Sequence, residues 1–336
     1  MAGQGKSRKR LLLEIRYLQE ETAPDTPIDI EGLRSYLGEL TAIRSIIYQD
    51  LHEMEEMGFG IRHTKNGHYY YDRQSFTQGE LSLMIDLICC AGYPDAESAR
   101  NLILHIKQMG NNEQFDKLTE QTWLFLRNKA DNPECIPSTD LIHEAIRKGK
   151  RIRFQYAHTD RFGNSVPDST YTLSPYQLIW NNSRLYVIGG YESKTGFQLR
   201  SFRVDKIYSP EMLTEKLLRL PREHAFYSTR QRGFDAERYL QSTFDMFNAK
   251  DEQLTSVTLC AANYLIGAMT DTFGQELQLQ EYDAAHMQFT ADIQVSNMFF
   301  GWLARFTADQ VRILAPAGLA ADYRAHLQSI IDGIGT

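Results

Sequence analysis

Between residues 41 and 57, polar and apolar side chains separate onto two faces of a predicted helix. Apolar residues recur at the spacing of one face: Ile43, Ile47, Leu51 and Met54. The other face carries hydrogen-bonding side chains and one guanidinium: Thr41, Arg44, Ser45, Tyr48 and His52. Arginine can bind guanine through two hydrogen bonds, and Thr, Ser and Tyr can reach bases or phosphates. This face suits entry into the DNA major groove, although ordinary amphipathic surface helices share the pattern.

Two further helices are predicted before this one. Apolar residues at helical spacing favour a helix over residues 6–20, which two prolines terminate. A short helix should begin after Asp29, a typical N-cap residue, and end at Gly38.

A tight hairpin is predicted after the third helix. Strand-like runs at residues 59–62 and 68–71 flank Lys65-Asn66-Gly67, and Asn-Gly strongly favours a hairpin turn. Three helices followed by such a hairpin are typical of a winged helix-turn-helix domain that binds DNA. Phosphate contacts are expected from the hairpin and from the basic N-terminus: Arg62, Lys65, Lys9 and Arg10.

The charge of this segment predicts how it would bind. Residues 1–75 contain ten Lys or Arg and twelve Asp or Glu, and the whole chain has a net charge of −7. DNA binding needs only a local basic face, so this charge does not exclude it. We expect one copy to bind weakly and a homodimer to bind an operator with two half-sites.

Residues 75–137 are predicted to be helical. Thr77 and Glu80 have the spacing of a capping box, and apolar stripes follow at residues 81–88, 99–109 and 114–127. Stripes of this kind usually form a core. Placed between a DNA-binding domain and a sensor, they would also suit a dimer interface.

Five short strands with tight turns predict a small β-barrel: residues 151–156, 170–173, 176–180, 184–191 and 197–206. Four strings within this region resemble a WYL domain: Phe154-Gln155-Tyr156, Leu173-Ser174-Pro175-Tyr176, Leu185-Tyr186-Val187-Ile188-Gly189 and Leu199-Arg200-Ser201-Phe202-Arg203-Val204-Asp205-Lys206-Ile207. The family's signature Trp-Tyr-Leu reads Leu185-Tyr186-Val187 here, so only the tyrosine is kept. Bacterial WYL regulators join a winged helix-turn-helix to this Sm-like barrel and often carry a ferredoxin-like C-terminal extension.

The resemblance implies an effector pocket formed by six residues: Tyr156, Ser174, Tyr176, Tyr186, Arg200 and Arg203. Arginine binds phosphate through paired hydrogen bonds and tyrosine stacks on bases, so a nucleotide or oligonucleotide effector would fit. Arg200 and Arg203 are three residues apart, which places them on opposite faces of a regular strand. One shared pocket therefore requires a bulge or a position at the end of the strand. The alternative is that one of the two arginines forms a structural ion pair with Asp205 or Glu192.

The C-terminal segment has the element order β-α-β-β-α-β, with Ser296 as an expected N-cap, and this order predicts a ferredoxin-like domain. The expected fold class is α+β and multidomain. Its parts are a winged helix-turn-helix (1–74), a helical linker (75–137), the Sm-like barrel (138–214), a connection (215–249) and the ferredoxin-like extension (250–336).

The sequence offers little support for an enzyme. It has no Gly-x-Ser-x-Gly, P-loop or Gly-x-Gly-x-x-Gly motif, and its nine histidines form no ligand pair. We therefore expect no catalytic residues, cofactor or metal. The four cysteines have no disulfide or zinc spacing, and no apolar run is long enough to span a membrane, so a cytoplasmic protein is expected.

These observations favour a bacterial transcriptional regulator that binds a specific double-stranded DNA operator and responds to a nucleotide or single-stranded nucleic acid. We favour repression over activation, with a phage-defence or DNA-damage operon as the target. The alternative is a nucleic-acid-sensing subunit of a defence or repair complex without direct promoter control.

Overall fold

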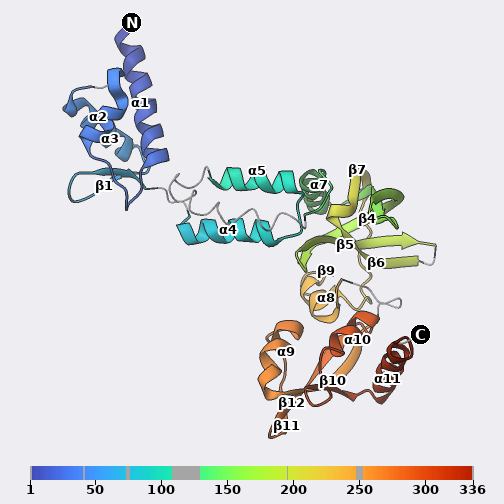
Figure 1. Cartoon of the computed structure of the whole chain (residues 1–336). Coiled ribbons are helices and arrows are strands. Elements are labelled where there is room, and N and C mark those ends of the chain that lie inside the picture. The colour runs from blue at the N-terminus through green and yellow to red at the C-terminus, as the bar shows by residue number, and fades with distance from the viewer. Residues whose placement is uncertain are drawn as a thin grey trace. The chain divides into compact units, whose positions relative to one another are not determined.

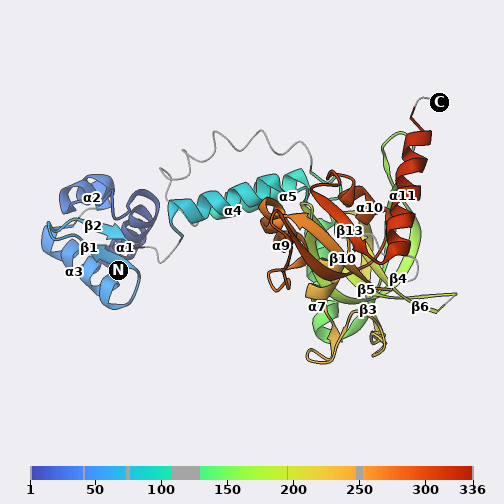
Figure 2. The same ribbon diagram turned by 90° about the horizontal axis from the view of Figure 1, so that it is seen from below.

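A computed structural model describes residues 2–40, 42–72, 76–107, 129–194, 196–246 and 253–334 (Figures 1 and 2). The chain divides into two compact units, Met1–Pro133 and Glu134–Thr336. The predicted α+β multidomain fold is confirmed. No helix within the described ranges is both long and apolar enough to cross a membrane.

The first unit begins with three helices and a hairpin: α1 (Ala2–Glu21), α2 (Ile30–Leu37), the 3₁₀ turn η1 (Gly38–Leu40), α3 (Arg44–Glu56), β1 (Ile61–His63) and β2 (Tyr69–Tyr71). Leu18, Leu33 and Leu51, one from each helix, are fully buried together. As predicted, the Asp29 carboxylate accepts a 2.8 Å hydrogen bond from the Gly32 amide and so caps α2. Gly38 ends this helix with a φ of 53°.

The hairpin has the predicted turn. Gly67 has a φ of +74° and its amide donates to the Thr64 carbonyl oxygen at 3.0 Å. Ile28 exchanges two backbone hydrogen bonds with Tyr69, of 2.8 and 2.7 Å, which fastens the hairpin to the loop between α1 and α2. These elements together form the winged helix-turn-helix.

One apolar residue was assigned to the wrong face. Ile43 is 65% exposed, whereas Ile47 and Leu51 are fully buried. The reason is that Ile43 is the N-cap of α3, with extended backbone, and does not belong to the helix face.

Two helices follow, α4 (Gln78–Cys90) and α5 (Ala96–Lys107), and they lie side by side (Figure 1). The Thr77 hydroxyl accepts from the Glu80 amide at 3.3 Å, and Glu80 accepts from the Thr77 amide at 2.6 Å, so the capping box is confirmed. Ile85 and Ile103 are buried between the two helices. The helix predicted over residues 114–127 lies outside the described residues.

The second unit begins with α7 (Cys135–Lys148) and a five-stranded antiparallel sheet in the order β6-β5-β4-β3-β7. The strands are β3 (Lys150–Thr159), β4 (Ser165–Asn181), β5 (Arg184–Ser193), β6 (Gly196–Arg203) and β7 (Ile207–Lys216), with the 3₁₀ turn η4 (Val204–Lys206) between the last two. The core contains Ile152, Phe154 and Val187, all at most 1% exposed. The last strand lies beside the first, as expected for an Sm-like sheet.

Three boundaries differ from the prediction. The strands expected at 170–173 and 176–180 are one strand, β4, whose register shifts between Pro175 and Gln177. β7 was not predicted, because most of its side chains are partly or fully exposed and give no clear alternation. α7 starts at Cys135 and so crosses the predicted boundary between the linker (75–137) and the barrel (138–214). Pro137 lies in its first turn, where a missing N–H is tolerated.

The segment interpreted as a connection is partly folded. It forms the short hairpin of β8 (Tyr227–Ser228) and β9 (Gly233–Phe234), followed by α8 (Ala236–Ser242). Phe226 and Tyr239 are fully buried against Ile188 and Leu199 of the five-stranded sheet. This packing holds the segment on one face of the sheet.

The C-terminal elements are β10 (Thr255–Ala262), the 3₁₀ turn η5 (Asn263–Leu265), α9 (Ile266–Phe273), β11 (Gln280–Asp283), β12 (His286–Ile293), α10 (Asn297–Leu303), β13 (Val311–Ala315) and α11 (Ala317–Asp332). All strand pairs are antiparallel, in the order β11-β12-β10-β13. The Ser296 hydroxyl accepts from the Phe299 amide at 3.3 Å and caps α10 as predicted. Element order and sheet order together give the predicted ferredoxin-like topology.

Candidate nucleic-acid and effector sites

The outward face of α3 is polar, as predicted. Arg44, Ser45, Tyr48 and His52 are exposed on the side opposite the buried residues. The Arg44 Nε lies 3.3 Å from the Glu31 Oε1 atom, and both side chains are more than half exposed. An ion pair this exposed contributes little to stability, so a phosphate or a guanine edge could replace Glu31. Thr41, the fifth member of the predicted face, lies outside the described residues.

The hairpin presents two of the expected phosphate contacts. Lys65 is exposed in the turn, and Arg62 is exposed on β1. The Arg62 guanidinium lies 3.6 Å from the Asp72 carboxylate and 4.0 Å from that of Glu55. These carboxylates neutralise part of the charge of Arg62. Of the two cations on the wing, Lys65 is therefore the more available for a phosphate contact.

At the N-terminus, the prediction for Arg10 is wrong. Its guanidinium donates two hydrogen bonds to the Asp50 Oδ2 atom, of 2.9 and 2.6 Å, and the residue is only 9% exposed. Arg10 therefore joins α1 to α3 inside the domain and cannot reach a phosphate. Its neighbour Lys9 is exposed, one residue further round α1.

A second carboxyl group lies beside this ion pair. Glu14 is fully buried, with its Oε1 atom 3.4 Å from the Arg10 Nε atom. Burial, together with the negative charge of Asp50, raises the pKa of Glu14 to about 7. The cluster thus contains two carboxyl groups around one guanidinium, and one of the carboxyl groups keeps its proton up to neutral pH.

In the five-stranded sheet, the hydroxyl of Ser174 has a partner within the protein. Ser174 is fully buried, and its hydroxyl accepts a 2.8 Å hydrogen bond from the Leu218 amide. The Tyr176 hydroxyl donates to the Leu218 carbonyl oxygen at 2.7 Å. Both polar groups therefore fix the backbone of the segment that follows β7, and only the ring of Tyr176 remains available.

Two glycines make this close packing of β4 and β5 achievable. A Cβ atom on Gly189 would lie 2.4 Å from the Ser174 carbonyl oxygen, and one on Gly190 would lie 2.4 Å from the Tyr176 hydroxyl. Side chains at these positions would push the strands apart.

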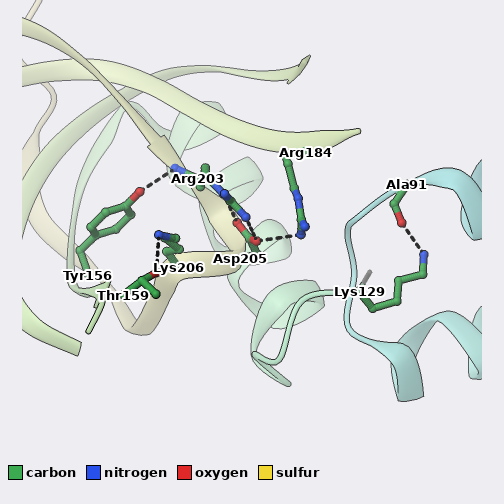
Figure 3. Close-up of polar contacts among 8 residues, drawn as sticks. All are labelled: Ala91, Lys129, Tyr156, Thr159, Arg184, Arg203, Asp205 and Lys206. Carbon is green, nitrogen blue, oxygen red and sulfur yellow. Dashed lines mark hydrogen bonds and ion pairs between the residues drawn. The ribbon is translucent and has the colours of Figure 1, made fainter. Parts of the chain in front are cut away.

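Two more of the predicted residues, Tyr156 and Arg203, meet at the end of β6 (Figure 3). The Arg203 guanidinium donates to both carboxylate oxygens of Asp205, at 3.0 and 2.6 Å. Arg184 donates to the same carboxylate at 3.1 Å. Arg203 thus forms the structural ion pair that the sequence left open as an alternative, and Arg184 joins it.

Two further side chains complete this group, which we name the Asp205 cluster: Tyr156, Arg184, Arg203, Asp205 and Lys206. The Tyr156 hydroxyl accepts from the Arg203 amide at 3.3 Å, and burial raises the pKa of this tyrosine to about 12. Lys206 donates to the Thr159 hydroxyl at 3.3 Å, and burial and the charge of Arg203 lower its pKa. The group therefore holds three cationic side chains, Arg184, Arg203 and Lys206, and one carboxylate, and this surplus of positive charge would favour an anion.

The remaining two predicted residues flank the Asp205 cluster or lie apart from it. Tyr186 is half-buried opposite Arg203 on the neighbouring strand. Arg200 is exposed and bonds the Gln198 amide oxygen, with its guanidinium 5.4 Å from the centre of the Tyr191 ring. No bulge brings Arg200 to Arg203, because the pairing of β5 with β6 is regular. The six predicted residues therefore do not share one pocket.

Sequence reasoning missed Arg184 and Lys206 as members of the site. The signal was present in the string Arg203-Val204-Asp205-Lys206, where three charges fall within four residues at a strand end. Arg184 could not be found this way, because the turn at the start of β5 brings it there. Figure 3 also draws Lys129 of the first unit, whose ammonium donates to the carbonyl oxygen of Ala91 at 2.6 Å.

His158 and Asp160, at the end of β3, have local structural roles. Asp160 accepts from the Phe162 and Asn164 amides, at 2.8 Å each, and shapes its own turn. His158 pairs with Asp168 on the exposed β3–β4 hairpin. Within the part of the chain that the structure describes, no three His, Cys, Asp or Glu side chains gather closely enough to hold a metal ion.

Comparison with known proteins identifies part of this unit. A WYL domain matches residues 137–212, from the first turn of α7 into β7. This match confirms the domain inferred from the residue strings. No curated protein sequence matches the chain.

Solved structures that match this chain include proteasome accessory factor B/C (PafBC) of Arthrobacter aurescens, with 15% sequence identity and a TM-score of 0.28. The match covers 98% of this chain and 49% of that chain, so the present chain spans about half the length of PafBC. A second is described as a CRISPR Cas-related protein, with 12% identity over 76% of this chain and 70% of that chain and a TM-score of 0.34.

Proposed function

We propose that this WYL-domain protein is a bacterial, sequence-specific DNA-binding transcriptional regulator, and we favour repression of its target genes over activation. The observation that carries the proposal is the exposed polar face of α3, with Arg44 and Tyr48 opposite a fully buried apolar face. A wing with an exposed Lys65 follows this helix. The combination fits a helix in the major groove and a hairpin on the phosphate backbone. We propose phage-defence or DNA-damage genes as its targets.

The test is selection of duplexes from a random DNA pool by the full-length chain, followed by gel-shift titration of the selected site. The double variant Arg44→Ala, Tyr48→Ala should lose at least about tenfold in affinity, because a well-placed base contact contributes about 1–3 kcal/mol. Arg324→Ala, which removes an exposed arginine from α11, is the matched control and should bind normally. Equal binding by the double variant would exclude α3 as the recognition helix.

The same selection experiment distinguishes the proposed regulator from the main alternative. A nucleic-acid-sensing subunit without promoter control would bind single strands and enrich no duplex motif. Recovery of a motif with two half-sites favours the regulator.

We further propose that the Asp205 cluster binds the effector, a nucleotide or single-stranded oligonucleotide. The support is its surplus of cationic side chains around the one carboxylate of Asp205, beside two tyrosine rings, Tyr156 and Tyr186. Lys206→Ala is the sharpest probe, since the Lys206 ammonium bonds only to the exposed Thr159 hydroxyl among the described residues. It should weaken oligonucleotide binding and leave operator binding unchanged. A Lys206→Ala protein that responds like wild type would place the effector elsewhere.

A homodimer is the proposed DNA-binding form. Leu83 and Leu87 are 59% and 62% exposed at neighbouring positions on α4, and Leu104 of α5 is 54% exposed. Analytical ultracentrifugation at micromolar concentration should show a dimer that Leu83→Glu, Leu87→Glu converts to a monomer. A monomeric wild-type protein would contradict this arrangement.

A further inference from the structure

A second anion site is built outside the Asp205 cluster, where the segment after β7 meets the β8–β9 hairpin. A cavity of 740 Å³ opens there, within the range of about 300–1,000 Å³ that is typical of small-molecule sites. Six of its lining residues carry the argument: Arg219, Arg222, Arg232, Tyr176, Tyr227 and Phe234. We name it the arginine cavity.

The charge of this cavity is strongly one-sided. Residues 216–234 contain five Lys or Arg and a single acidic residue, Glu223, in a chain of net charge −7. None of the lining residues is acidic. Across the described ranges, Arg219, Arg222 and Arg232 make no ion pair or hydrogen bond, and all three are exposed. Three guanidinium groups held together without a carboxylate repel one another, and a bound polyanion would remove that repulsion.

The other wall of the cavity is aromatic. Tyr176 and Phe234 have ring centres 6.1 Å apart and planes inclined by 30°. Tyr227 pairs with Phe234 across the hairpin. Half-buried rings beside guanidinium groups suit a flat, conjugated ring that carries phosphate, since the ring can stack while the phosphates take paired hydrogen bonds.

The cavity is held by a fixed frame. The amide of Leu218 donates a hydrogen bond to the Ser174 hydroxyl, and its carbonyl oxygen accepts one from the Tyr176 hydroxyl. These two bonds position the irregular segment that supplies Arg219 and Arg222. The hairpin that supplies Arg232 is anchored by Phe226, which is fully buried against Tyr239 with ring centres 5.1 Å apart. A site held in place in this way loses little conformational entropy when a ligand binds.

From these observations we propose that the arginine cavity binds a nucleoside diphosphate or a phosphorylated ligand of the same kind. The base would lie against Tyr227 and Phe234, and the diphosphate would lie among the three arginines, whose combined charge roughly balances it. This site is separate from the Asp205 cluster and does not depend on DNA binding by α3. It gives the WYL unit a place for a small ligand in addition to an oligonucleotide.

Isothermal titration of the full-length protein with ADP, inorganic pyrophosphate and adenosine tests the proposal. ADP should bind saturably, and each of the other two should bind at least about tenfold more weakly, because each makes only part of the contacts. Arg219→Ala, Arg232→Ala should weaken ADP binding at least about tenfold. Arg230→Ala is the matched control, because Arg230 lies on the same hairpin and does not line the cavity, and it should bind ADP normally.

Two more variants locate the ligand. Tyr227→Leu should weaken ADP binding and leave pyrophosphate binding unchanged, which assigns the ring to the aromatic wall. Arg200→Ala should leave ADP binding unchanged. Unaltered ADP binding by the Arg219→Ala, Arg232→Ala protein would overturn the site. Equal affinities for ADP and pyrophosphate would overturn the assignment of a planar ring, and loss of binding in Arg200→Ala would move the ligand to the sheet.

Discussion

The N-terminal domain and the WYL domain each contain an arginine clamped on an aspartate, and the two clusters differ in their surplus charge. Around Asp50, one guanidinium meets two carboxyl groups, and Arg10, Glu14 and Asp50 are all at most 9% exposed. Around Asp205, two guanidinium groups and the ammonium of Lys206 gather, and the arginine side chains are 25% and 31% exposed.

The sign of the surplus charge determines whether a cluster takes up a proton or an anion from solvent. A buried group with a surplus carboxyl relieves its charge by keeping a proton, as the pKa of Glu14 shows. A half-exposed group with surplus cations can relieve its charge by binding an anion. The first cluster should therefore respond to pH, and the second should respond to phosphates.

The largest expected effect comes from removing the cation of the first cluster. Arg10→Ala would leave Asp50 and Glu14 buried without a positive partner and should destabilise the N-terminal domain by about 3–5 kcal/mol. Hydrogen exchange of peptides from α1 and α3 would report this loss directly. Lys9→Ala, at the exposed neighbouring position, is the control. If hydrogen exchange in Arg10→Ala is as slow as in wild type, the ion pair between Arg10 and Asp50 contributes nothing to stability.

The next effect depends on pH. The folded-state pKa of Glu14, about 7, lies above the ordinary value of 4.5. The stability that this group contributes is therefore complete below about pH 4.5 and is lost as the pH rises to about 7. Glu14→Gln stays neutral, so it should match wild type near pH 4.5 and exceed it by about 2–3 kcal/mol at pH 8. Parallel stability curves across this pH range would contradict the assignment.

A smaller loss is expected in the second cluster. Asp205→Asn keeps the shape of the side chain but removes the charge shared by Arg184 and Arg203, which should destabilise the WYL domain by about 1–2 kcal/mol. Because the surplus positive charge increases, the variant should also bind a single-stranded oligonucleotide more tightly. Denaturant titration and fluorescence anisotropy measure the two effects. Weaker oligonucleotide binding would show that Asp205 itself contacts the ligand.

The smallest effect is expected outside both clusters. Arg200 is exposed, and among the residues that the structure describes it contacts the Gln198 side chain and the face of the Tyr191 ring. Arg200→Ala should change the free energy of unfolding by less than about 0.5 kcal/mol. A loss near that of Asp205→Asn would show that the two arginines of β6 act together after all.

The sequence predicted elements well where a periodic pattern met a specific capping or turn residue. Asp29, the Asn66-Gly67 turn, Thr77 and Ser296 each fixed the start or turn of an element correctly, because each acts through its own backbone neighbours. The ferredoxin-like order followed from such local signals alone.

Pairings between distant residues could not be predicted in the same way. Nothing near Arg10 in the sequence indicates Asp50, which lies 40 residues further on. The same holds for Ser174, whose hydroxyl was expected to face a ligand and instead binds the Leu218 amide. The arginine cavity was missed because its residues come from three separate parts of the chain. These are β4, the irregular segment after β7, and the hairpin of the two-residue strands β8 and β9.

The two hydrogen bonds that join Leu218 to β4 have a consequence for protein engineering. Ser174 and Tyr176 hold the amide and the carbonyl oxygen of this residue and make no use of its side chain. The point of attachment is therefore independent of which amino acid occupies position 218. We expect that the cavity-lining residues after it, from Arg219 to Arg222, can be replaced together without disturbing the WYL sheet. The same sheet could then carry binding sites for ligands of different charge and shape.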